Sequence, residues 1–276
     1  MTERATGRGG AWLQPGTEGT AVPSASREGG ERERGGPEQV VLSEQRRQAE
    51  ARHRTHALLQ IWLSPAFPVG GFAYSHGLEK AVEHGWIKDR ASLETWLADL
   101  VSHGSQRNDL ILLAAAWRAA TARDQATLRD TAELSAALHP SRERHLEATQ
   151  QGGSFIAAIE TAWPADALPW ATATGAAVPT YCTAVGFTAA AHAVPLDDTL
   201  AAYAVAVIGA LTSAAIRLGI VGQTDAQRVI AGLLPLLTQT AHEVETSTID
   251  ELGGAAWRSD IAAQQHETQT TRLFRS

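Results

Sequence analysis

Residues 73–77 read AYSHG, and their serine and histidine come closer to nucleophilic chemistry than any other part of the sequence. The segment is one residue away from the G-x-S-x-G nucleophile elbow, in which a serine follows a buried strand on a tight turn. Pro68, Gly70 and Gly71 occupy the place of that strand, and proline and glycine disfavour a strand interior. We therefore expect Ser75 to act as a helix N-cap. A small serine hydrolase using Ser75 is the alternative.

The sequence carries no other pattern for catalysis or for a resident metal ion. Its only lysines, Lys80 and Lys88, do not follow a G-x-x-x-x-G frame, so the chain has no P-loop. The ten histidines form no H-x-x-x-H or H-x-H pair, and Cys182 is the only cysteine. We expect no cofactor, no metal site and no catalytic residue. A single cysteine also suits a reducing compartment, which predicts a cytoplasmic protein.

The possible nucleophile lies in a turn-rich loop, residues 61–77, rather than at the end of a strand. The residues expected to shape this loop are Pro65, Pro68, Gly70 and Gly77, because proline fixes φ and glycine permits positive φ. Phe72 and Tyr74 are aromatic where a solvated loop would be polar. They either pack into the core of the chain or face a partner. After the loop, Leu78, Val82 and Trp86 predict a short helix that stops at Gly85.

The composition favours an all-α fold, since alanine is abundant and no alternating strand pattern is present. We expect a single compact helical domain of about eight to ten helices over residues 51–276. The predicted helical segments are 43–60, 89–103, 105–117, 124–138, 141–164 and a helix from Thr224 that ends at 233–237. Residues 167–196 and 199–216 contain almost no charge and predict two central, wholly buried, alanine-rich helices. Residues 246–260 predict a flexible loop.

Charge and composition exclude two classes of partner and set one segment apart. Residues 1–50 are rich in Gly, Glu and Arg and predict a disordered extension. Residues 1–55 hold nine Arg and eight Glu, whereas the remainder holds fourteen Lys and Arg against twenty-two Asp and Glu. Such an acidic body argues against nucleic acid as a partner. The apolar segments are rich in Ala, Thr and Gly rather than Leu and Phe, which argues against a membrane span.

Three motifs in this order resemble the UreF family of urease accessory proteins. The first is SPAFPVG at 64–70 with YSHGLE at 74–79, and the second is RL at 217–218 with GQ at 222–223 and Gln227. The third is HE at 266–267 with RLFRS at 272–276. The family usually has Pro-Leu where this chain has IV at 220–221, and Tyr-Ser where it has TT at 270–271. The resemblance covers about residues 56–276 and implies an all-helical, dimeric, non-enzymatic protein.

The resemblance further implies a role in urease maturation. Family members bind a second accessory protein, UreD (also called UreH), and with it recruit the GTPase UreG, so that nickel is inserted into apo-urease. Carried over residue by residue, partner contact falls on Phe72, Tyr74, Gln223, Gln227, Arg272, Leu273, Phe274 and Arg275. In the family, the C-terminal tail becomes ordered on partner binding. Glu79 is either a first-turn helix acid or a polar contact.

Overall fold

The computed structural model describes residues 37–165 and 169–276, and the chain divides after Gln45 into two units, of which residues 46–276 are the second. Helix α1 (Pro37–Trp62) begins with a proline, which is favourable at the first helical position. The predicted lead-in helix over 43–60 is confirmed, and it extends further toward the N-terminus. The disorder predicted for residues 1–50 stays a prediction: residues 37–50 belong to α1, and residues 1–36 lie outside the described residues.

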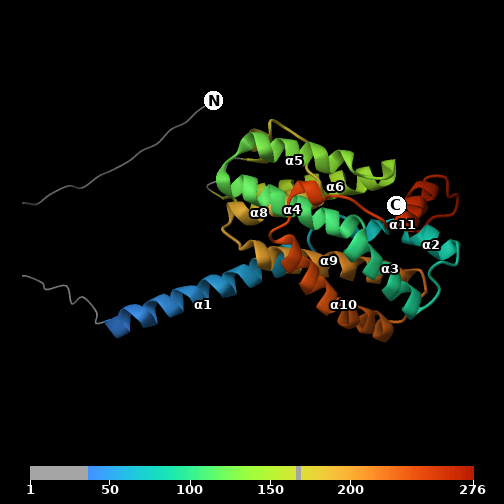
Figure 1. Ribbon diagram of the computed structural model, residues 1–276, viewed down its shortest axis with the longest axis horizontal. Coiled ribbons are helices and arrows are strands. Elements are labelled where there is room, and N and C mark those ends of the chain that lie inside the picture. The colour runs from blue at the N-terminus through green and yellow to red at the C-terminus, as the bar shows by residue number, and fades with distance from the viewer. Residues whose placement is uncertain (1–36, 166–168) are drawn as a thin grey trace, which may run out of the picture. The chain divides into compact units, whose positions relative to one another are not determined.

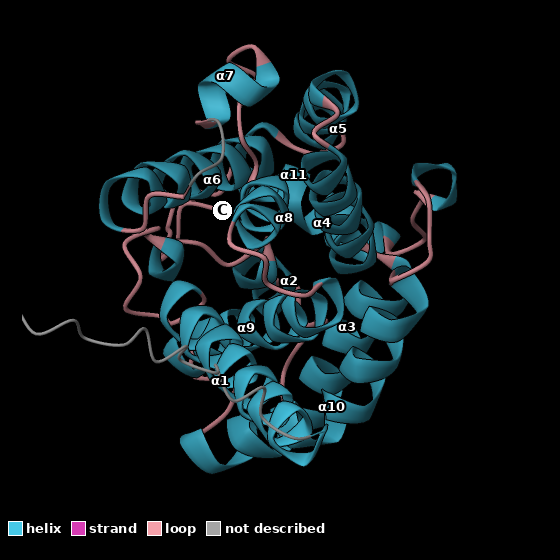
Figure 2. Ribbon diagram, turned by 90° about the vertical axis from the view of Figure 1, so that its left-hand side faces the viewer, coloured by secondary structure: helices cyan, strands magenta, loops and turns pink. Residues whose placement is uncertain are grey.

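The all-α fold is confirmed, because every regular element in the described ranges is a helix (Figure 2). After α1 the elements are η1 (Gly71–Ala73), α2 (Leu78–Glu83), α3 (Arg90–His103), α4 (Ser105–Ala122), α5 (Gln125–Ala137), α6 (Arg142–Ala162), α7 (Trp170–Thr174), α8 (Tyr181–Ala191), α9 (Leu196–Arg217), α10 (Gln223–Val244), η2 (Ile249–Glu251) and α11 (Trp257–His266).

Several helices begin and end where the sequence predicts. The Asp89 side chain accepts the backbone N–H of Ser92 at the start of α3, and the Ser92 hydroxyl returns the contact as a capping box. Ser141 caps α6 in the same manner by accepting the Arg144 N–H at 3.2 Å. Gly104 separates α3 from α4, as expected. Local sequence therefore sets these boundaries.

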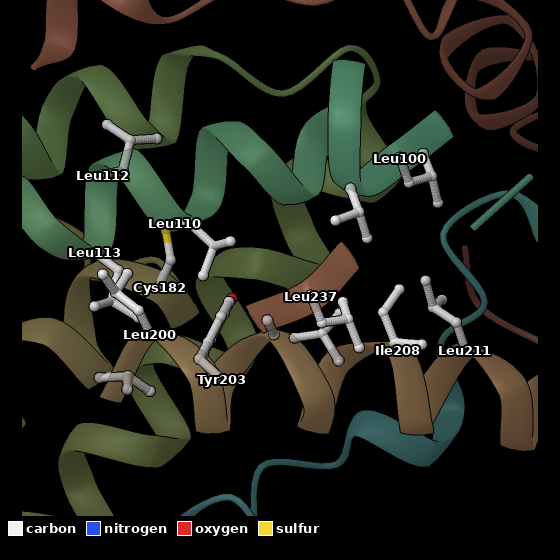
Figure 3. Packing of buried hydrophobic residues seen from close by; sticks show 14 of the residues in the cluster. Leu100, Leu110, Leu112, Leu113, Cys182, Leu200, Tyr203, Ile208, Leu211 and Leu237 are labelled. Atoms are coloured by element: carbon white, nitrogen blue, oxygen red, sulfur yellow. The ribbon is translucent and has the colours of Figure 1, made fainter. Parts of the chain in front are cut away.

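Helix α8 packs closely against both α4 and α6 (Figure 2). Two glycines permit this approach: a Cβ at Gly186 would collide with the Leu113 carbonyl, and one at Gly152 would collide with the Pro179 carbonyl. Side chains from α4, α8 and α9 point toward one another in the core (Figure 3). Helix α10 packs against α9 and α3 and closes another side of the core.

Helix α9 departs from the predicted pair of wholly buried helices. It is long and apolar enough to cross a membrane, with a mean hydropathy of 1.9, but 56% of that window is buried within the structure. It also exposes Ala210 and Ser213 on one side, whereas α8 buries nearly all its side chains. The side chains on this side of α9 are small, so this side borders a cavity instead of filling the core.

Two further predictions need correction. Helix α10 does not end near residues 233–237 but continues through Pro235 to Val244. Its buried stripe of Leu233, Leu237, Ala241 and Val244 continues past the proline, so packing outweighs the cost of the lost backbone hydrogen bond. Helix α2 ends at Glu83 with His84 as its C-cap, and Gly85, the predicted stop, follows with φ 69°, but Trp86 falls outside the helix.

Trp86 therefore lies beyond α2 and does not belong to its apolar stripe. Its ring stacks on that of Trp96 in α3, with centroids 6.3 Å apart. Val82 is only partly buried, so Leu78 is the one member of the predicted stripe that enters the core completely.

The segment expected to be a flexible loop, 246–260, contains η2 and the start of α11. It is tied to its neighbours by backbone contacts. The Ala255 N–H donates to the His103 carbonyl at 2.7 Å, and the Gly253 N–H donates to Asn108 Oδ1 at 3.1 Å. These bonds hold the segment against the ends of α3 and α4, which meet at this point.

Candidate partner-docking site

The loop between α1 and α2 is anchored by a buried ring. Phe67 packs against Phe155 and Trp163, with ring centroids 5.2 and 5.6 Å away. Two tight turns surround it, in which the Phe67 N–H donates to the Ser64 carbonyl at 2.9 Å and the Val69 N–H donates to the Phe67 carbonyl at 2.8 Å. The Phe67 side chain therefore anchors the first part of the loop on α6.

Two glycines in this loop adopt left-handed backbone conformations, and their surroundings differ. Gly70 has φ 72° and open space around it, while Gly77 has φ 76°. A Cβ at Gly77 would lie 2.8 Å from the backbone nitrogen of Ala263 in α11. Gly77 thus permits both the turn and the close approach of α11, and Pro65 and Pro68 are exposed at the loop surface.

The last five residues, 272–276, lie along the end of this loop and the start of α2, and Figure 1 shows the C-terminal end of the chain next to α2 and α11. The Arg275 N–H donates to the Ala73 carbonyl at 2.8 Å, and the Ser75 N–H donates to the Ser276 carbonyl at 2.8 Å. The tail of this chain is thus docked on its own loop by backbone hydrogen bonds.

The Ser75 hydroxyl takes part in this docking. It donates to the Ser276 carbonyl and accepts the Glu79 N–H at 3.3 Å, and the residue is fully buried. The N-cap position of α2 is Gly77, so the prediction that Ser75 is the N-cap is wrong, although the Ser75 hydroxyl binds both a first-turn N–H of α2 and the tail. Among the described residues, no histidine nitrogen is bonded to this hydroxyl.

Glu79 holds the tail from the first turn of α2. Its carboxylate accepts the N–H of Leu273 at 2.7 Å and that of Phe274 at 3.0 Å. It also lies 3.2 Å from Nε2 of the buried His266, whose Nδ1 lies 2.6 Å from a carboxylate oxygen of Glu143. Glu79 is thus a polar contact as well as a first-turn acid.

A second buried carboxylate, Glu147, holds the end of the tail. It accepts hydrogen bonds from Arg144 Nη1 at 2.6 Å and from the Ser276 hydroxyl at 2.6 Å, and it lies 2.7 Å from His76 Nε2. Burial raises the pKa of Glu147, but Arg144 and His76 outweigh it and hold this pKa at about 2. The ionised carboxylate is therefore fully paired.

Arg217, at the end of α9, joins the tail to the loop. Its guanidinium lies 4.3 Å from the centroid of the Phe274 ring, and it also donates to the Phe72 carbonyl. Phe274 is only 3% exposed. A cation over an aromatic face is attracted by the ring quadrupole, so Arg217 clamps both segments.

The structure places the predicted partner residues in two groups. Exposed side chains belong to Phe72 (77%), Leu273 (59%), Arg272 and Arg275. Tyr74 and Phe274 instead face inward, and the Tyr74 hydroxyl donates to Gln150 of α6. Burial raises the pKa of Tyr74, partly offset by a hydrogen bond from Arg275. Tyr74 and Phe274 therefore support the surface from below.

Gln223 and Gln227 both lie exposed in the first turns of α10. Gln227 lines the cavity between α4, α6, α8 and α9, together with Phe72 and Arg217. Gln223 does not line this cavity. Arg272 is engaged within the chain, since its guanidinium pairs with Glu143 and donates to the Glu267 carbonyl at 2.7 Å.

A cavity of about 380 Å³ lies under the loop, between α4, α6, α8 and α9. Burial raises the pKa of Asp109 in it to about 7, against the opposing charge of Arg144. Burial also lowers the pKa of His139 to about 3 and raises that of Cys182 to about 12. The thiol is thus protonated and unreactive at neutral pH. Among the described residues, no group of three His, Cys, Asp or Glu could hold a metal ion.

The groups that fix the tail were not predicted as site residues. Glu143, Arg144 and Glu147 appear in sequence as the polar side of a helix, yet Arg144 and Glu147 are buried. The spacing of Glu143 and Glu147, one helical turn apart on α6, was the available signal. That spacing is equally common on solvent-exposed helices. Only the contacts with the docked tail show that Glu143 and Glu147 belong to the site.

Comparison with known proteins shows the family to which this chain belongs. A sequence model of the UreF family matches residues 87–234. A protein of Rhodopseudomonas palustris (strain HaA2), named urease accessory protein UreF, is 50% identical over 218 residues, which cover 79% of this chain and 92% of that protein. The chain belongs to the UreF family. A relative with the same name from Mesorhizobium japonicum is 48% identical over 79% of this chain and 95% of its own length.

The resemblance inferred from the three motifs is thereby confirmed, and its urease accessory class with it. Two of those motifs, the loop at 64–79 and the tail at 266–276, lie outside the matched range of the UreF model. In this member of the UreF family, the structure brings these two motifs into direct contact.

Proposed function

We propose that this chain is a urease maturation chaperone without catalysis of its own. It binds UreD/UreH, recruits the GTPase UreG and supports GTP-dependent insertion of nickel into apo-urease. It acts in the cytoplasm as a homodimer, and neither nucleic acid nor a membrane is a partner. No residue is assigned to nickel binding.

One observation carries this proposal. The tail and the loop, which carry two family motifs, are fixed together so that Phe72 and Leu273 are both largely exposed on the same face. Exposed aromatic and aliphatic side chains on a well-supported backbone are typical of protein interfaces. At least seven hydrogen bonds within the described chain hold the tail, so the fold itself keeps the Phe72 and Leu273 side chains exposed. We interpret the surface as a docking face for the maturation partners.

The test is capture of purified UreD/UreH, and then of UreG, by the tagged full-length chain. Deletion of residues 272–276 should remove the signal, because it removes Leu273 and uncovers the loop. Trp257→Ala provides a matched control, since Trp257 is exposed on α11 and lies outside the proposed face. Unchanged capture by the deleted chain would contradict the assignment of the docking face.

The cellular test is urease activity in cells that lack this gene. Activity should fall and should return with the wild-type gene but not with the tail-deleted one. Excess nickel in the medium separates a role in metal supply from a role in assembly. Full activity without the gene would refute the proposal.

The second candidate, a serine hydrolase, rests only on the AYSHG pentapeptide. A fluorophosphonate probe that labels the wild-type chain but not Ser75→Ala would favour it. We expect no labelling, because the hydroxyl is buried and bonded to Ser276.

A further inference from the structure

An open groove of about 750 Å³ runs between the loop and the tail. Its apolar side chains include Phe72 and Leu273, and α6 adds the uncharged polar residues Gln150 and Ser154. The groove therefore combines exposed apolar surface with hydrogen-bonding groups. Such a surface suits an extended segment of another protein better than a compact ligand, because Phe72 and Leu273 are both largely exposed.

The charge of the groove is opposite to that of the chain. Arg217 and Arg275 both line it, and no Asp or Glu is among its described lining residues. The chain as a whole has a net charge of −7. Two unopposed cations on an acidic protein form a local positive potential that attracts anionic groups.

Neither arginine is neutralised within the described part of the chain. Arg272 pairs with Glu143, but Arg217 and Arg275 have no ion pair with a described carboxylate. Arg217 binds the Phe72 carbonyl and the Phe274 ring, which orient its guanidinium without cancelling its charge. Each guanidinium therefore keeps donors for an external acceptor.

We propose that this groove binds an acidic segment of a partner protein. A carboxylate of the segment pairs with Arg217 and Arg275, and a neighbouring aliphatic or aromatic side chain packs between Phe72 and Leu273. Guanidinium and carboxylate groups form paired hydrogen bonds of defined geometry, which fixes the register of the segment. This inference rests on the proposed docking face and adds the chemistry of its partner, with Arg217 as a further contact residue.

Labelled peptides tiled along UreD/UreH, UreG and apo-urease provide the probe. Each tile is made twice, as the natural sequence and with its Asp and Glu replaced by Asn and Gln, and binding to the full chain is measured by fluorescence anisotropy. We expect at least one acidic tile to bind and to lose about tenfold or more in affinity when neutralised. Its affinity should also weaken as salt is raised from 50 to 300 mM.

The arginines are tested by Arg275→Gln and Arg217→Gln, each expected to weaken the acidic tile by about tenfold. Arg275→Gln keeps the backbone bond to Ala73, so it should leave the fold intact. Arg217→Lys keeps the positive charge at this position, so it tests the role of the charge separately from the packing of the guanidinium on Phe274. Arg228→Gln is the matched control, because Arg228 is exposed on α10 and paired with Asp225.

Three results would overturn the inference: no tile that depends on its acidic residues, equal weakening by Arg228→Gln, or displacement of the tile by single-stranded RNA at equal concentration. The outcome for the docking face is read separately. If deletion of 272–276 abolishes capture of UreD/UreH but Arg217→Gln and Arg275→Gln do not weaken it, the docking face stands and the acidic partner segment is wrong. If the deletion has no effect, both fail.

Discussion

The carboxylate of Glu79, in the first turn of α2, accepts the backbone N–H of Phe274 at 3.0 Å. This contact joins the first and last of the three family motifs. A charged side chain thus holds a backbone group of the tail, in addition to the contacts that Glu147 and the buried Phe274 ring make. The consequences are measurable at the tail itself.

Replacing Glu79 by Gln should loosen the tail. The amide keeps one acceptor oxygen for Leu273 or Phe274 but replaces the other carboxylate oxygen and removes the negative charge of Glu79. We expect a loss of about 1.5–3 kcal/mol in local stability, typical of hydrogen bonds to charged groups. Hydrogen–deuterium exchange at 272–276 should rise accordingly. Glu83→Gln, an exposed change on the same helix, should leave this exchange unchanged.

Phe274 and Leu273 should separate stability from binding. Phe274→Ala removes a buried ring under Arg217 and should lower the free energy of unfolding by about 3 kcal/mol or more, measured by urea denaturation. Leu273→Ala removes an exposed side chain and should change stability by less than about 0.5 kcal/mol while reducing capture of UreD/UreH. Equal stability losses for the two variants would show that Phe274 is not an internal anchor.

Two glycines with similar φ should respond differently to alanine. Gly77→Ala forces a Cβ against the backbone of Ala263, so α2 and α11 must move apart. Gly70→Ala meets open space and carries only the backbone strain, about 1–2 kcal/mol. We expect a clearly larger drop in melting temperature for Gly77→Ala. Equal drops would mean that α11 does not approach α2 as described.

Asp109 should make stability depend on pH. Burial raises its pKa from 3.8 to about 7, so its stabilising effect is complete below about pH 4 and is lost as pH rises through 7. Asp109→Asn should therefore be more stable than wild type at pH 8–9, by about 1–3 kcal/mol and with a higher melting temperature, and should match it below about pH 4.

The control for Asp109 is Asp130→Asn, an exposed acid on α5 that should shift the melting temperature little at any pH. A stability difference between Asp109→Asn and wild type that stays constant from pH 4 to 9 would show that the buried carboxyl does not titrate in this range.

Most helix boundaries could be predicted because they depend on neighbouring residues. The caps at Asp89 and Ser141 and the break at Gly104 are local contacts, visible as residue types at short spacing. Pro235 misled the prediction of α10, since the apolar stripe that overrides it becomes decisive only when packed on α3 and α9. Ser75 misled the prediction of α2, because its partner Ser276 is distant in sequence.

By itself, the sequence determined the all-α class, the family and the motifs that form the candidate site, because these depend on composition, periodicity and short patterns. Only the tertiary structure decided which motif side chains face outward. Phe72 and Tyr74 are nearly adjacent, as are Leu273 and Phe274, yet one of each pair is exposed and the other buried. The direction of each is fixed by contacts to Gln150, Arg217 and Glu79, which come together only when helices distant in sequence pack around the tail.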